Sequence, residues 1–340
     1  MFPMARSFAA GSFALTALLT STATTTTATT TKTTTATTAT TKTATTATTK
    51  TASTASTNTT ATATTATTAT TTAATAATAT PTAHFTVNLR GSYAAARAVG
   101  FNVFDVSGST SNPAGVKTKL NALPAGSKAM IWVGNLGKKA GVQGFTRAQF
   151  QAQVNALATD PRVFGYFIAD EPHPILFPTV VAEIRARADY LRAKAPAQKS
   201  FIVVLDGSKY CNGTLGCEYA ALAPSKSHVD VVGVDSYPCH LGAPCDFTKI
   251  PQRVNAAIKA GIPRGQIAPV YQSFGQEGAT NPYYRTPTAA ELQKMLDTWK
   301  ANLPAPVMDY AYSWGTQTSS PQALINHPEL QRVARTHNAG

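Results

Sequence analysis

Core-forming residues are almost missing from the first quarter of the chain. Residues 24–82 contain no Leu, Ile, Val, Phe or Trp and consist almost only of Thr and Ala. A segment of this composition cannot bury enough apolar surface to offset the conformational entropy that folding removes. We therefore expect residues 24–82 to form a disordered Thr/Ala-rich linker. Such hydroxyl-rich tethers suit O-glycosylation, and this one would associate the protein with a cell wall or surface.

Long apolar runs are missing as well. The apolar segment near the N-terminus, residues 8–19, is shorter than the roughly 20 residues that a membrane-spanning helix needs. It follows Arg6 and precedes the small residues Ser21, Thr22 and Ala23. A positive residue, a short apolar core and a small-residue cleavage site are typical of a secretory signal peptide. We therefore expect residues 1–23 to be a signal peptide. We also expect the protein to be secreted and to have no transmembrane span.

Acidic residues are absent before residue 83, so the N-terminal region carries only positive charge. Residues 83–340 hold 25 basic and 16 acidic residues, a net charge of +9 out of the chain's +13. A basic domain favours anionic surroundings. Because no stripe of Arg and Lys alternates with aromatic residues, we expect no nucleic-acid partner.

Cysteine is scarce, with four residues: Cys211, Cys217, Cys239 and Cys245. In a secreted chain an even number of cysteines predicts disulfide bonds. Three pairings are open, and two local loops are the simplest of them. A metal site using His240 is the alternative, but it lacks the close Cys-x-x-Cys spacing of zinc knuckles. We expect disulfides, no metal ion and no cofactor.

Residues 83–340 alternate between apolar runs and helical patterns. This alternation predicts a parallel sheet covered by helices, and eight repeats predict a (β/α)8 TIM barrel acting as a monomer. An open doubly wound sheet is the alternative, but no Gly-rich phosphate loop follows the first run. The expected strands are residues 85–89, 102–106, 128–133, 163–169, 201–205, 229–234, 267–271 and 308–312. The expected helices are residues 92–99, 116–123, 146–158, 178–195, 217–223, 251–260, 288–303 and 320–336.

Residues 163–173 contain the most informative motif. An apolar strand runs directly into Asp170-Glu171-Pro172, and the carboxyl ends of barrel strands are where such folds place their chemistry. Other predicted strands end in acids, amides and aromatics, which suit sugar hydroxyls and the flat faces of pyranose rings. Core packing is the competing interpretation for the aromatics. The candidate site residues are Asn88, Asp105, Trp132, Asp170, Glu171, His173, Asp235, Tyr237, Tyr271, Gln272, Tyr312 and Trp314.

Asp170-Glu171-Pro172 resembles the Asn-Glu-Pro motif of the TIM-barrel glycoside hydrolase clan that carries its acid/base and nucleophile on strands four and seven. Residues 233–238 and 310–315 resemble the sixth and eighth strand ends of the same proteins. The resemblance implies that Glu171 is the general acid/base and that Asp170 binds the sugar 2-hydroxyl. The chain departs from the pattern at Gln272, where the clan has its nucleophilic Glu.

Three explanations of Gln272 stay open. Asp235 or Glu277 would supply the second carboxylate, or the protein binds glycan without cleaving it. With Asp235 as the partner, strands four and six are separated by one strand, so we expect a wide carboxyl gap and inversion. Glu171 would then be the acid and Asp235 the base, with Tyr237 and Gln272 orienting water or sugar. An esterase or deacetylase is disfavoured because no Gly-x-Ser-x-Gly elbow or His-rich cluster occurs. We expect a secreted hydrolase of polysaccharide or cell-wall glycan.

Overall fold

The computed structural model describes residues 82–137, 144–205 and 208–340. The predicted signal peptide and all of the predicted linker except its last residue lie outside the described residues. Among the helices of the described ranges, none is both long enough and apolar enough to cross a membrane.

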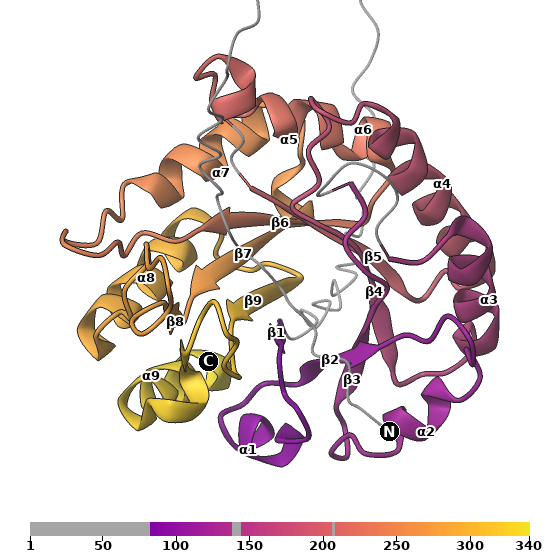
Figure 1. The fold of residues 1–340 in the computed structure, drawn as a ribbon, viewed down its shortest axis with the longest axis horizontal. Coiled ribbons are helices and arrows are strands. Elements are labelled where there is room, and N and C mark those ends of the chain that lie inside the picture. Colours follow the sequence, from indigo (N-terminus) through magenta and orange to yellow (C-terminus); the bar gives the residue numbers. More distant parts are fainter. Residues whose placement is uncertain (1–81, 138–143, 206–207) are drawn as a thin grey trace, which may run out of the picture. The chain divides into compact units, whose positions relative to one another are not determined.

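Eight parallel strands close into a barrel, which confirms the predicted (β/α)8 fold (Figure 1). Each strand pairs with its neighbour in the chain, and the last strand pairs with the first. The barrel strands are β1 (Ala83–Thr86), β2 (Val103–Ser107), β3 (Lys128–Trp132), β4 (Val163–Asp170), β5 (Lys199–Val204), β6 (Val231–Ser236), β7 (Ile267–Gln272) and β9 (Met308–Tyr312).

The helices surround the strands, as Figure 1 shows. Two of them begin with capping boxes at Thr146 and Thr288. Each threonine hydroxyl accepts a hydrogen bond from the backbone amide three residues later, and the side chain of that later residue accepts one from the threonine amide. The α-helices are α1 (Tyr93–Ala98), α2 (Val116–Leu120), α3 (Arg147–Leu157), α4 (Thr179–Lys194), α5 (Cys217–Leu222), α6 (Pro224–Ser227), α7 (Lys249–Lys259), α8 (Ala289–Asn302) and α9 (Pro328–Ala339). Short 3-10 turns are η1 (Ser208–Cys211), η2 (Arg264–Gln266) and η3 (Leu324–Asn326).

The predicted last helix, residues 320–336, is wrong in its first part. Strand β10 (Gln322–Ala323) pairs there with β8 (Phe274–Gly275), and η3 follows. The helix begins only at Pro328, since proline is favoured in the first turn of a helix and disfavoured further inside.

Strand alternation divides the apolar residues into two layers. Inward-facing residues fill the barrel with aromatic rings, and outward-facing residues pack beneath the helices. At the centre the rings of Phe167 and Phe201 lie 4.8 Å apart, and those of Phe85 and Tyr310 lie 4.7 Å apart. Gly233 leaves room for this packing, because a Cβ there would lie 3.1 Å from the Phe201 ring. The barrel is therefore a filled core and not a pore.

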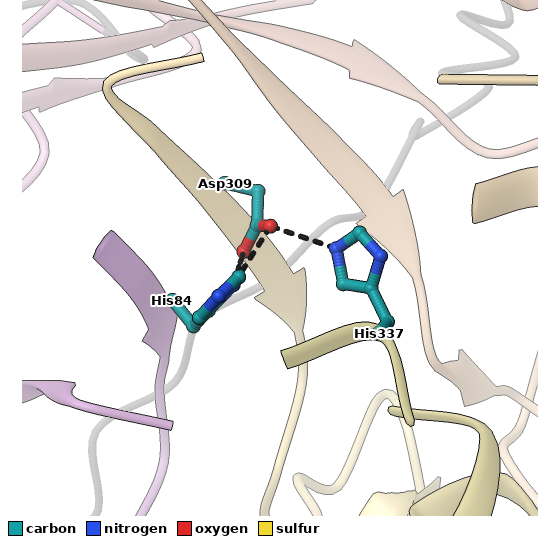
Figure 2. A group of neighbouring side chains, drawn as sticks. All are labelled: His84, Asp309 and His337. Atoms are coloured by element: carbon teal, nitrogen blue, oxygen red, sulfur yellow. Dashed lines mark hydrogen bonds and ion pairs between the residues drawn. The ribbon is translucent and has the colours of Figure 1, made fainter. Parts of the chain in front are cut away.

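Two further contacts fasten the outer layer. His337 of α9 bonds Asp309 of β9, which also contacts His84 of β1 (Figure 2). Disulfides join Cys211 to Cys217 and Cys239 to Cys245. Of the three pairings open from the sequence, the structure has the two local loops.

Candidate active site

A pocket lies at the carboxyl ends of the barrel strands. It is small and combines carboxylates, amides and aromatic rings. Trp132 and Phe167 form one aromatic wall, with ring centroids 4.8 Å apart. The pocket is lined by Val87, Asn88, Asp105, Trp132, Phe167, Asp170, Tyr310, Tyr312 and Gln317.

Glu171 and Asp235 bring two carboxyl groups close together. Asp235, on β6, is 1% exposed, and the charge of Glu171, which follows β4, raises the pKa of its carboxyl. No described residue donates a hydrogen bond to either Asp235 oxygen. A neighbouring negative charge disfavours the ionised form of a carboxyl. The side chains of the non-adjacent strands β4 and β6 therefore converge inside the barrel, while the wide carboxyl gap expected from strand counting stays a prediction.

Burial favours the neutral form of the Asp235 carboxyl. Removal from water raises the pKa of Asp235 well above its usual range, and the negative charge of Glu171 raises it further. Arg253 opposes the shift: its guanidinium donates to the Asp235 backbone carbonyl at 2.7 Å. Glu171, by contrast, is only half-buried. The two carboxyl groups thus lie in different environments, and that of Asp235 favours a proton.

Two of the candidate site residues have a left-handed backbone conformation. Glu171 has φ +48° and Asn88 has φ +66°, conformations that residues other than glycine adopt rarely. The Glu171 amide donates to the Val203 carbonyl of β5 at 3.0 Å, which holds this turn at the end of β4. Strained backbone of this kind is concentrated at functional sites.

Tyrosines surround the acids. Burial raises the pKa of Tyr310, and the charge of Asp170 adds to the effect. Burial likewise raises the pKa of Tyr237, with a further contribution from Asp235. The Tyr237 and Tyr312 rings stack with centroids 6.0 Å apart. The raised pKa values keep the Tyr237 and Tyr310 hydroxyls protonated, so they are able to donate hydrogen bonds.

Gln317 is a pocket residue that the sequence did not indicate. It lies in the loop after β9 and accepts a hydrogen bond from the Tyr312 hydroxyl at 3.3 Å. Its amide nitrogen, like that of Asn88, is buried without a partner among the described residues. Because buried donors are normally bonded, both amides are suited to a ligand oxygen. The strand-end pattern did not indicate Gln317, because it lies five residues beyond the last residue of β9 and two residues beyond the 310–315 motif.

Three predicted binding residues are corrected by the structure. Tyr271 and Trp314 point outward into the layer beneath the helices, where Trp314 donates to Ser92 at 2.7 Å. Neither residue lines the pocket. Gln272 is fully buried, and its amide is bonded to backbone groups on all sides. It fixes the loops around the site and leaves no group free to orient a sugar.

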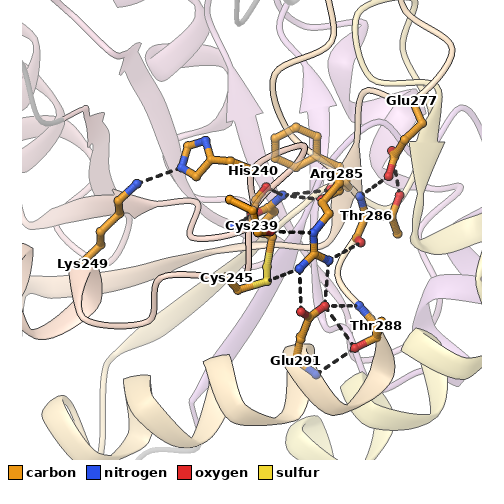
Figure 3. The surroundings of a disulfide bond; sticks show 12 residues. Cys239, His240, Cys245, Lys249, Glu277, Arg285, Thr286, Thr288 and Glu291 are labelled. Carbon is orange, nitrogen blue, oxygen red and sulfur yellow. Dashed lines mark hydrogen bonds and ion pairs between the residues drawn. A yellow bond between two sulfur atoms is a disulfide. The ribbon is translucent and has the colours of Figure 1, made fainter.

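Further candidates lie outside the pocket lining, namely Glu171, Asp235, Tyr237, His173 and Glu277. His173 is 3.5 Å from the buried carboxyl group of Glu218 and packs against Tyr210, so it lies beside α5. Glu277, the alternative second carboxylate, accepts from the Thr286 amide at 2.6 Å and from its hydroxyl at 3.0 Å (Figure 3). Both oxygens of Glu277 are thus engaged by Thr286, whereas those of Asp235 accept no hydrogen bond from a described residue.

Neither a protein-family model nor a curated protein matches the sequence. Solved structures do match. A β-galactosidase from Rahnella sp. R3 aligns over 76% of this chain and 55% of its own, with TM-score 0.51 and 13% identity. A β-galactosidase from Marinomonas ef1 aligns over 76% of this chain and 59% of its own, with TM-score 0.50 and 10% identity.

Saccharomyces cerevisiae Gas2p, solved as a mutant in complex with laminaritetraose and laminaripentaose, aligns over 72% of this chain and 56% of its own. Its TM-score is 0.50 and its identity 12%. This chain thus spans little more than half the length of these three proteins. The feature it shares with them is the fold, a TIM barrel.

Proposed function

We propose that the protein is a secreted glycoside hydrolase whose chemistry is carried by Glu171 and Asp235. The observation that supports this most directly is the convergence of the two carboxyl groups, one of them deeply buried with a raised pKa. Environments that push the pKa values of two carboxyls apart assign them the roles of acid and base. The two disulfides favour an oxidising, extracellular location.

The electrostatics suggest a division of labour. Asp235 gives its proton to the leaving oxygen while the Glu171 carboxylate attacks the anomeric carbon, so one C–O bond forms and the glycosidic C–O bond breaks. The Asp235 carboxylate then takes a proton from water, which attacks the same carbon and releases Glu171. Two carboxyls that lie close together leave little space for a water between them. This favours retention over the inversion that the strand order suggested.

Substrate class is inferred from the pocket and the structural neighbours. Carboxylates and free amides facing aromatic walls suit sugar hydroxyls and ring faces. Because matched structures include β-galactosidases and a protein bound to laminari-oligosaccharides, β-linked glycans of polysaccharides and cell walls are the first substrates to test.

Leaving-group chemistry separates the two roles. We expect Glu171→Gln to lose turnover of both natural β-glycans and dinitrophenyl β-glycosides, since a nucleophile is needed for each. Asp235→Asn should lower turnover of glycans by roughly 10²–10⁴-fold. It should keep most of its turnover of the dinitrophenyl substrate, whose leaving group needs no proton. NMR of the first product anomer should show retention. Glu277→Gln is the matched control and should leave turnover unchanged. Undiminished turnover by Glu171→Gln would remove that residue from the mechanism.

A glycan-binding protein without turnover is the second candidate, favoured by the Gln at position 272 where the related clan carries its nucleophile. It predicts that wild type binds oligosaccharide in calorimetry while releasing no reducing ends. In that case Glu171→Gln and wild type would differ in affinity and not in turnover.

A further inference from the structure

Two histidines share one buried carboxylate at the other end of the barrel. His84 is near the start of β1, Asp309 near the start of β9, and His337 near the end of α9 (Figure 2). The Nδ1 atom of His84 is 2.9 Å from Asp309 Oδ2, and the Nε2 atom of His337 is 2.9 Å from the same oxygen. All three groups lie on the outer surface of the barrel, so they are separate from the Glu171–Asp235 pair.

The donor set matches the preference of zinc. Zn²⁺ takes imidazole nitrogen and carboxylate oxygen at about 2.0–2.2 Å in tetrahedral geometry, which separates neighbouring ligand atoms by about 3.3 Å. The ligand atoms of His84, Asp309 and His337 all lie within 4.8 Å of one another. A shift of a few tenths of an ångström from the observed 2.9 Å contacts would give that spacing.

A second observation also indicates a ligand at this place. Tyr271, on the neighbouring strand β7, is 0% exposed, and its hydroxyl has no partner among the described residues. Its ring lies 6.1 Å from that of His337. A buried hydroxyl without a partner is unusual, and a water on a bound ion would supply one. The His337 side chain is 22% exposed, which gives an ion a way in from solvent.

We propose that His84, Asp309 and His337 form a zinc site that fastens helix α9 to the first and last strands of the barrel. Three protein ligands leave a fourth position for water, with the Tyr271 hydroxyl beside it. The amino-terminal face of a barrel serves stability and the carboxyl-terminal face chemistry. The ion is therefore structural, and its removal loosens α9 without touching the carboxylate pair.

Calorimetric titration of the EDTA-stripped full chain with ZnCl₂ tests this site. We expect one Zn²⁺ per chain and, at a hundredfold excess over Kd, an increase in Tm of about 5–10 °C. His337→Ala should weaken binding at least tenfold and abolish the Tm increase. His327→Ala is the matched control, because His327 bonds Glu329 and Gln322 outside the cluster, and it should bind zinc as wild type does.

Cobalt keeps the proposal testable if His337→Ala fails to fold. Wild-type protein loaded with Co²⁺ should show the intense visible bands of tetrahedral coordination. Absence of zinc binding by wild type, equal binding by His337→Ala, or the pale spectrum of octahedral cobalt would each overturn the site. The hydrogen-bonded His–Asp–His cluster would then be a structural contact without metal.

Discussion

Asp235 is a buried residue whose negative charge is disfavoured both by burial and by the charge of Glu171. Its pKa in the folded protein is raised above the unfolded value of 3.8. The protonated form is therefore favoured by folding, and that stabilisation is complete below about pH 3.8 and lost as pH rises through the raised pKa. Each unit of the shift corresponds to about 1.4 kcal/mol.

We expect Asp235→Asn to stabilise the protein in a pH-dependent way. Asparagine cannot ionise, so the Tm of the variant minus that of wild type should be near zero at pH 4 and increasingly positive towards pH 8. Thermal unfolding of both proteins between pH 4 and pH 8 measures this difference in Tm. The exposed Asp246 has a pKa lowered by the Thr248 hydroxyl, so Asp246→Asn should show the opposite sign, a small loss that vanishes in acid. Parallel curves for wild type and Asp235→Asn would contradict the assignment.

Single residues show where sequence reasoning stops. The sequence placed Glu171 and Asp235 at strand ends, and the structure brings them together. It could not give the direction of Tyr271, because neighbours on a strand point to opposite faces and a shift by one residue exchanges them. The sequence also did not show that side chains of β4 and β6 converge, because the order of the strands does not determine how far their side chains extend into the barrel.

Among the elements, the loops after β6 and β7 are joined through the amide of Gln272. Its oxygen accepts from the Cys239 amide at 2.9 Å, and its nitrogen donates to the carbonyls of Cys239 and Arg285 at 3.1 and 2.9 Å. The adjacent disulfide and the Arg285–Glu291 pair strengthen the same junction (Figure 3). The amide is therefore a structural cross-link, which explains why the position is Gln.

Restoring the nucleophile of the related clan should accordingly fail. Gln272→Glu would set a buried carboxylate against backbone carbonyls, so we expect about 1–3 kcal/mol of lost stability for each orphaned group and no gain in turnover. Urea denaturation and the glycan assay measure both. Gln276→Glu is the matched control, because the oxygen of the Gln276 side chain accepts hydrogen bonds from the Tyr283 and Tyr284 amides. A carboxylate oxygen can accept the same bonds, so this variant should lose less stability. A more active Gln272→Glu enzyme would refute this account.

Elements were the most predictable level of the structure. Buried strands appear as apolar runs and helix starts as capping residues, so all eight barrel strands were anticipated within a few residues. The exception is the segment from Ser320 to His327, where the short pair of β8 and β10 replaces helix. A two-residue strand has no periodicity to detect, and its existence depends on a partner far away in the chain.

At the scale of the whole molecule, stability depends on the aromatic interior of the barrel. Phe201 is 0% exposed and packs against Phe85, Phe167 and Tyr310. Phe201→Ala should lower the free energy of unfolding by about 3–5 kcal/mol, because it removes a large buried ring and leaves a cavity. Chemical denaturation measures the change. Leu176, which is 45% exposed, is the control: Leu176→Ala should stay within about 0.5 kcal/mol. Similar losses in both variants would speak against a tightly packed interior.

Ring closure makes the covalent starting point of the barrel arbitrary. The first strand pairs with the last, and Asn338, near the end of α9, donates to the Val99 carbonyl between α1 and β2. Both ends of the barrel domain thus lie beside the same two repeats. A circular permutant, with residue 340 linked to residue 82 and the chain opened in another loop at the amino-terminal face, would keep every strand neighbour. The repeat at which the barrel begins along the gene is therefore free to change while the carboxylate pair stays in place.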